Sequence, residues 1–116
     1  MMNKISDIEL KKYTFLKKFT IKRTLQDNGG LQTFVSIVMA EESSPKSHLL
    51  NIQCFDVLDL RIKELNSQYQ YWLEITDIAS WHRENQRYYV TDTEEEIFKL
   101  YCRDIKIYKI KYKDSK

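Results

Sequence analysis

The sequence predicts a single all-β domain, mainly antiparallel, built as a β-sandwich or a small barrel of six to seven strands. A strong hairpin-turn signal, Asp27-Asn28-Gly29-Gly30, separates two segments in which apolar and polar residues alternate. The same alternation recurs between Leu50 and Ile75, and it is typical of half-buried strands. No alternating strand–helix pattern supports a parallel sheet, so hairpin-connected strands favour a sandwich or barrel.

The length of 116 residues fits one domain, residues 1–116, with no room for a second independent core. The hydrophobic share of 42% is enough to order a compact core. The formal net charge of +2 is too small for the basic footprint of a dedicated nucleic-acid-binding domain. No signal-peptide-like or membrane-spanning apolar run is present, which predicts a cytoplasmic protein with no membrane partner.

The N-terminal residues offer one short helix, near residues 6–12. Ser6-Asp7-Ile8-Glu9 matches a capping box, and apolar residues follow it at helical spacing. A second capping box at residues 93–96 would support at most a single turn. Both stretches are short compared with the β-patterned segments that follow them.

The first hairpin is predicted from Phe15 to Gln26 and from Leu31 to Glu41. In its first strand Phe19, Ile21 and Leu25 share one face. In its second strand one face carries Leu31, Thr33, Val35, Ile37 and Met39.

The middle of the chain reads as strands that change phase. After a polar, proline-containing loop, apolar and polar residues alternate from Leu50 to Cys54. The alternation is interrupted at Phe55-Asp56-Val57 and resumes from Leu58 to Ile62. Either one strand carries a bulge near Asp56, or two short strands meet there at a bend.

The last third of the chain adds further strands. Alternating residues from Tyr71 to Thr76 and the β-favouring run from Arg87 to Asp92 predict two strands, joined by a polar loop at Trp81 to Gln86. The final run, residues 97–112, changes phase after Arg103-Asp104, which again indicates a bulge or a bend.

No motif indicates catalysis, a cofactor or a metal, so we predict a non-enzymatic protein without a cofactor. Cys54 and Cys102 lack the clustered spacing of zinc ligands and are expected to be reduced and buried. A disulfide is the alternative if their strands are neighbours. His82, with Glu84 nearby, is expected to be a solvated loop histidine rather than an acid–base catalyst.

Aromatic and arginine residues gather between Trp72 and Tyr89, and these residue types dominate protein-binding hot spots. Trp81 is expected either to be an exposed anchor or to cap one end of the fold. Asp92 and the following glutamates offer acidic groups to a basic partner. The candidate partner-binding residues are Trp81, Arg83, Arg87, Tyr89, Glu94 and Glu95.

Single-stranded nucleic-acid binding is the alternative function. Lysines alternate with isoleucine and tyrosine from Lys106 to Lys113, and a second basic group lies between Lys11 and Arg23. If these two strands pair, they would form a positive stripe with tyrosines available for base stacking. The competing explanation is that lysines protect edge strands from aggregation.

The segments VLDLRI, WLEITDIASW and RYYVTDTEEEIFKLYCRDIKI, from Val57 to Ile107, resemble a pattern found in small bacterial β proteins. The similarity includes Asp77-Ile78 and Tyr101-Cys102-Arg103-Asp104. Several such families are immunity proteins of toxin systems. The resemblance implies a protein-binding domain, an immunity or regulatory protein, whose partner is another protein such as a toxin.

Overall fold

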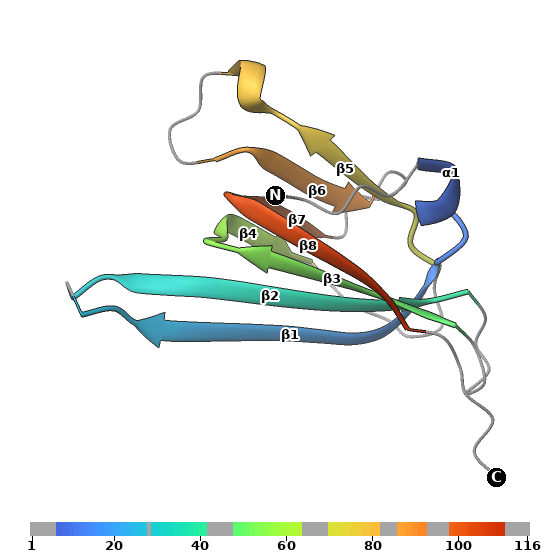
Figure 1. Ribbon diagram of the computed structural model, residues 1–116, viewed down its shortest axis with the longest axis horizontal. Helices are drawn as coiled ribbons and strands as arrows, with labels where there is room; N and C mark the ends of the chain where they lie inside the picture. Colours follow the sequence, from blue (N-terminus) through green and yellow to red (C-terminus); the bar gives the residue numbers. More distant parts are fainter. Residues whose placement is uncertain are drawn as a thin grey trace, which may run out of the picture.

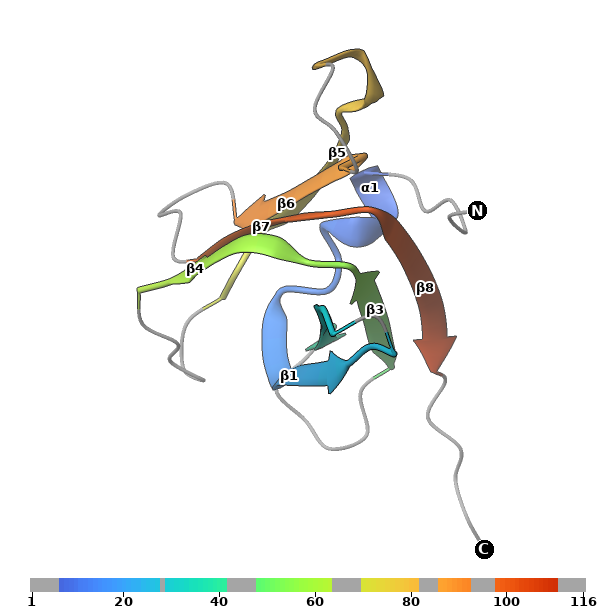
Figure 2. The ribbon, with the colours of Figure 1, turned by 90° about the vertical axis from the view of Figure 1, so that its left-hand side faces the viewer.

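The structure is a computed structural model that describes residues 7–27, 29–41, 48–63, 70–81, 86–92 and 98–110. Its strands form two four-stranded sheets that face each other, and every strand pair is antiparallel (Figures 1 and 2). The predicted all-β sandwich is confirmed, with eight strands in the described residues instead of six to seven.

Sheet A has the strand order β1-β2-β3-β8. Its members are β1 (Phe15–Leu25), β2 (Leu31–Ala40), β3 (Leu49–Phe55) and β8 (Asp104–Ile110). Sheet B has the order β4-β7-β6-β5. Its members are β4 (Leu58–Ile62), β7 (Phe98–Cys102), β6 (Tyr88–Asp92) and β5 (Leu73–Asp77).

The β1–β2 hairpin forms where the sequence predicts it. Leu25 pairs with Leu31 across the turn, and the Gln26 amide donates to the Gly30 carbonyl at 2.7 Å. Gly29 has a φ of 86°, a left-handed conformation that side chains with a Cβ disfavour. The pairing of β2 with β3 starts at Phe34, so the end of the hairpin projects beyond the sandwich (Figure 1).

The chain changes sheets twice at one corner of the molecule. β3 continues into β4 through residues 56 and 57, and β7 continues into β8 through Arg103 (Figure 2). The Arg103 amide donates to the Phe55 carbonyl at 3.0 Å, so the two crossings stay bonded to each other. Asp56 has a φ of 55°, which turns the chain out of sheet A. Both predicted phase changes are therefore bends between two strands in different sheets.

The core lies between the sheets and is built from the predicted alternation. In β2, Val35, Ile37 and Met39 are fully buried, and in β8 the inward residues are Ile105 and Ile107. Further buried residues of this cluster are Leu10, Tyr13, Leu50, Ile52, Cys54, Val57, Tyr71, Leu73, Tyr88, Val90, Phe98, Leu100 and Cys102.

β4 departs from the simple alternation expected between Leu58 and Ile62. Leu58 is 50% exposed and Ile62 is 37% exposed, whereas Leu60 packs against the core. The register with β7 shifts between Leu58 and Arg61, and Asp59 has a φ of 53°. The irregular backbone turns one end of this edge strand away from the core.

The helical elements are short. α1 (Asp7–Leu10) is a single turn inside the range expected for a helix, and a 3₁₀ turn, η1 (Ala79–Trp81), ends at the first residue of the expected loop. The turn expected at residues 93–96 lies outside the described residues. No helix in the described part of the chain is long and apolar enough to cross a bilayer.

Candidate partner-binding surface

The outer face of sheet B carries a row of aligned side chains that crosses all four strands. Leu58 pairs with Tyr101, Tyr101 with Tyr89, and Tyr89 with Thr76. The two tyrosine rings pack with centroids 4.9 Å apart and planes inclined by 31°. Because their neighbours along β6 and β7 point into the core, both rings lie on the outer face. The row therefore joins Leu58, the two tyrosines and Thr76 into one strip across the outer face of sheet B.

Arg87 directly precedes β6, two residues before Tyr89. Its guanidinium stands 5.5 Å from the centre of the Tyr88 ring and 3.7 Å from the Asp77 carboxylate. Both charged side chains of this ion pair are more than half exposed, at 59% and 52%. Such an exposed pair contributes little to stability, so the guanidinium is not strongly held by Asp77.

A pocket of about 410 Å³ adjoins Arg87 at the corner where the chain changes sheets. Its cationic members are Arg87, Arg103 and Lys106, and Lys106 lies 5.5 Å from the centre of the Phe55 ring. The other lining residues are Phe55, Asp56, Tyr88 and Asp104. Burial raises the pKa of Tyr88, so its phenol remains protonated at neutral pH.

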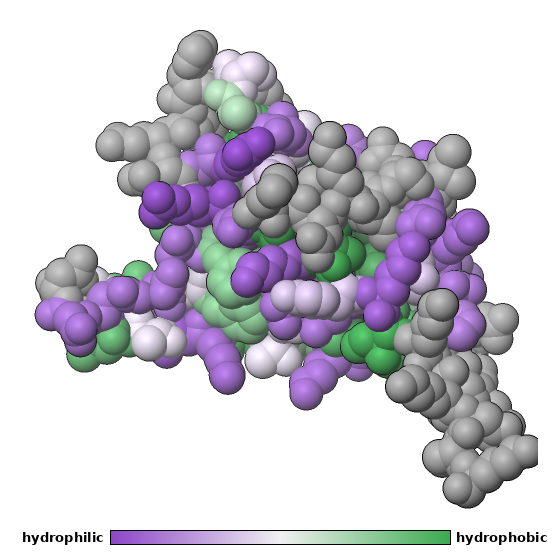
Figure 3. Space-filling model, viewed as in Figure 1, coloured by the Kyte–Doolittle hydropathy of each residue, from purple (hydrophilic) through white to green (hydrophobic). Residues whose placement is uncertain are grey.

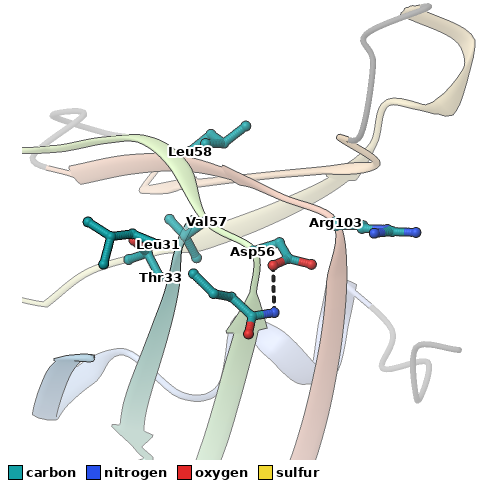
Figure 4. A pocket seen from close by; sticks show the side chains of 7 residues that line it. Leu31, Thr33, Asp56, Val57, Leu58 and Arg103 are labelled. Atoms are coloured by element: carbon teal, nitrogen blue, oxygen red, sulfur yellow. Dashed lines mark hydrogen bonds between the residues drawn. The ribbon is translucent and has the colours of Figure 1, made fainter. Parts of the chain in front are cut away.

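A second pocket, of about 270 Å³, opens between the base of the projecting hairpin and the corner (Figure 4). It is lined by Leu31, Gln32, Thr33, Asp56, Val57, Leu58 and Arg103. The Gln32 amide donates to the Asp56 carboxylate at 2.6 Å. Asp56 and Arg103 line both pockets, so the two hollows adjoin at the corner.

The predicted partner-binding residues fall into two groups. Arg87 and Tyr89 are described: Tyr89 lies in β6, and Arg87 directly precedes that strand. Trp81 ends η1, but its side chain is not described. Three predicted residues lie outside the described part of the chain: Arg83, Glu94 and Glu95. The same holds for His82.

Asp92 does not offer an acidic group to a partner, contrary to our expectation. Its residue is only 2% exposed, and its carboxylate accepts the Phe98 amide at 3.0 Å. The neighbouring Thr91 hydroxyl donates to the Phe98 carbonyl at 3.1 Å. These hydrogen bonds join the end of β6 to the start of β7, so the Asp92 carboxylate is engaged within sheet B.

The two lysine-bearing strands of the nucleic-acid hypothesis do not pair. β1 and β8 occupy opposite edges of sheet A, with β2 and β3 between them. Lys109 is also engaged at short range, 2.6 Å from the Glu9 carboxylate. The continuous positive stripe that this hypothesis required is therefore absent from these strands.

The two cysteines come together between the sheets. Cys54 faces inward from β3 and Cys102 from β7, and both are reduced and fully buried. A hydrogen bond with Cys54 and burial raise the pKa of the Cys102 thiol. This confirms the expected reduced, buried cysteines. In the described residues no three His, Cys, Asp or Glu side chains are placed to hold a metal ion.

Sequence reasoning missed Leu58, Tyr101 and Arg103 as surface residues. Tyr101 could have been found, because it alternates with the core residues Leu100 and Cys102 and must face outward. The exposure of Leu58 had no sequence signal, since it depends on the irregular backbone of β4.

Comparison with known proteins identifies one family. A family model described as Immunity protein PIM8 matches residues 1–108, which include both sheets except the last two residues of β8. No curated protein and no solved structure matches the chain.

Proposed function

The chain belongs to the PIM8 immunity protein family, and from this premise we propose that it binds a toxin protein and holds it inactive without catalysing a reaction. The observation that carries the proposal is the family match over residues 1–108. We also propose that binding takes place in the cytoplasm.

We assign part of the binding surface to the outer face of sheet B, where Tyr89, Tyr101 and Leu58 form a strip and Arg87 stands beside it. Aromatic side chains held by a sheet lose little conformational entropy on binding, which favours affinity. The exposed guanidinium adds a directional contact to a carboxylate. Trp81, Arg83, Glu94 and Glu95 remain members of the proposed surface.

The test uses the product of a toxin-like gene adjacent to the gene of this chain. Wild-type protein is expected to co-purify with that product and to restore growth to cells that express it. Tyr89→Ala and Arg87→Ala are each expected to weaken binding by roughly tenfold or more, as for central interface residues. Trp81→Ala belongs to the same series.

The matched control is Tyr108→Ala. Tyr108 is 43% exposed and lies on β8, on the outer face of the other sheet. This variant is expected to bind as the wild type does. Absence of any complex between the wild-type protein and the toxin contradicts the proposed function. Equal binding by Tyr89→Ala, Arg87→Ala and the wild type contradicts the assigned surface.

A further inference from the structure

The projecting end of the β1–β2 hairpin carries aliphatic side chains that the core does not cover. We call residues 21–25 and 31–33 the hairpin arm. By the β1–β2 register, Ile21, Leu25 and Leu31 share the face that carries the core residues Val35 and Ile37 further along the hairpin. The strands of sheet B do not extend over the arm (Figure 1), and the side chains of Ile21, Leu25 and Leu31 are exposed to solvent.

The exposure is large for side chains of this type. Ile21 is 46% exposed, Leu25 is 71% exposed and Leu31 is 64% exposed. Single exposed aliphatic residues are ordinary, but a contiguous group on one face is typical of an interaction site. Figure 3 shows hydrophobic surface on the projecting end of the hairpin, next to hydrophilic side chains.

The hairpin also holds the positive charge of the molecule. Residues 15–40 contain four basic residues and one acidic residue, a net charge of +3, whereas the remaining 15 basic and 16 acidic residues sum to −1. Within the arm, Arg23 pairs with Thr33 and so shares the apolar face, while Lys22 lies on the opposite face. Both side chains are exposed.

The apolar face ends in the 270 Å³ pocket at the corner. Leu31 and Val57 line this pocket, and Arg103 lies on its opposite side, where its side chain extends away from Leu31 and Val57 (Figure 4). The Val57 amide donates to the Thr33 carbonyl at 2.9 Å, so the corner and the base of the arm are rigidly joined. The pocket is smaller than the roughly 300–1,000 Å³ of small-ligand sites and suits a protein side chain.

We propose that the hairpin arm and this pocket dock an acidic segment of the partner protein that presents an aliphatic side chain between carboxylates. The aliphatic side chain would enter the pocket beside Leu31 and Val57, and its acidic neighbours would meet Arg23 and Arg103. This inference rests on the proposed function, since it names the partner's chemistry.

Charge and shape favour that occupant over the others. A second copy of the chain would bring two hairpins of charge +3 together, which disfavours association through the arms. A nucleic-acid strand would need aromatic rings for stacking, and the described arm residues on the apolar face are aliphatic, threonine or arginine.

The test compares two double variants in binding to the toxin used above. Leu25→Asp with Leu31→Asp removes the apolar contacts, and Lys22→Glu with Arg23→Glu reverses the charge. Each is expected to raise Kd by at least roughly tenfold. Raising NaCl from about 50 to about 500 mM is expected to slow wild-type association and to leave the charge-reversed variant less affected.

Matched controls separate the arm from general surface effects. Ile110→Asp changes an aliphatic residue that is 45% exposed on β8, and Lys11→Glu reverses an exposed lysine after α1. Both controls are expected to bind as the wild type does. Circular dichroism should show all variants folded, because the substituted side chains lie outside the core.

The outcomes distinguish the two proposals. Wild-type binding that both arm variants retain overturns the arm as the docking site and leaves the proposed function intact. Absence of wild-type binding overturns the proposed function. In that case the role of the arm is tested by comparing the binding of two synthetic peptides to the wild-type protein, one of alternating Glu and Leu and one of alternating Lys and Leu. Preference for the Glu peptide that the arm variants lose supports the inference, and equal or no binding overturns it. A dimer, or oligo-dT binding, that the arm variants abolish also overturns it.

Discussion

At the residue scale, Asp56 shows how one position decides the path of the chain. Its φ of 55° is rare for a residue with a Cβ, but aspartate and asparagine tolerate this conformation better than most. Its carboxylate accepts the Gln32 amide at 2.6 Å, which links the corner to β2. The residue therefore supplies both the turn out of sheet A and a bond that holds the turn in place.

Replacing Asp56 with Ala is expected to lower the free energy of unfolding by about 1–3 kcal/mol. Alanine is less favourable in the left-handed backbone conformation, and it cannot accept the hydrogen bond from Gln32. Asp56→Asn retains an acceptor oxygen and a tolerant backbone, so it is expected to stay within about 0.5 kcal/mol of the wild type. Urea unfolding of the three proteins measures both differences. Equal stability of the Ala and Asn variants would contradict both the backbone preference and the hydrogen bond to Gln32 as sources of stability.

At the element scale, an ion pair connects the helical turn to the last strand. Lys109 of β8 stands 2.6 Å from the carboxylate of Glu9 in α1. The hydrogen bond to Lys109 lowers the pKa of Glu9, and the same bond raises the pKa of Lys109. Both groups are well solvated, so the pair adds little to stability but helps to position α1 against β8.

The pair makes a pH-dependent contribution whose sign follows from the two shifts. The lowered pKa of Glu9 gives stability that is present above its ordinary value of 4.5 and is lost as the pH falls through the folded value. The raised pKa of Lys109 gives stability that is present below 10.5 and is lost as the pH rises through its folded value.

Glu9→Gln is therefore expected to give a small decrease in Tm at neutral pH and low salt, and no decrease below the folded pKa of Glu9. Thermal unfolding followed by circular dichroism across the acid range checks this, with Glu74→Gln, which changes an exposed residue of β5, as the control. A decrease in Tm that persists unchanged into strong acid would assign the effect to packing and not to charge.

At the scale of the whole molecule, the two sheets depend on each other for burial. β3 and β7 belong to different sheets, and each carries a cysteine on its inward face. Cys54 and Cys102 contact each other in the interior between the sheets. Phe98 of β7 meets Phe19 of β1 edge to face, with ring centroids 5.7 Å apart. Neither sheet can bury its apolar face without the other, so the molecule is expected to unfold as one unit.

The reactivity of the two cysteine thiols provides a test of this cooperative unfolding. Because burial excludes reagents and the raised pKa of Cys102 keeps the reactive thiolate scarce, neither cysteine is expected to react with iodoacetamide in the native protein at pH 8. In guanidinium chloride both are expected to react, in parallel with the loss of β structure measured by circular dichroism. Rapid labelling of either thiol in the native protein would mean that the sheets separate locally.

Local sequence patterns accounted for most elements of the fold. Alternation from Phe15 to Ala40 and the glycines of the turn predicted the first hairpin because side-chain direction along a strand depends only on residue parity. The same parity placed Cys54 and Cys102 in the interior. The gathering of arginine and aromatic residues pointed to Arg87 and Tyr89, and their part in binding a partner stays a prediction.

Sequence by itself thus determined that this chain is an antiparallel β protein, where most strands lie and which faces are apolar. Tertiary structure alone decided that the breaks at Asp56 and Arg103 carry two paired strands from one sheet to the other. It also decided that β1 and β8 lie at opposite edges of sheet A and that the Asp92 carboxylate bonds to the Phe98 amide within sheet B. It decided as well that the end of the β1–β2 hairpin extends beyond the sandwich. The physical reason is that strand order and burial depend on contacts between residues far apart in the chain, which local alternation cannot encode.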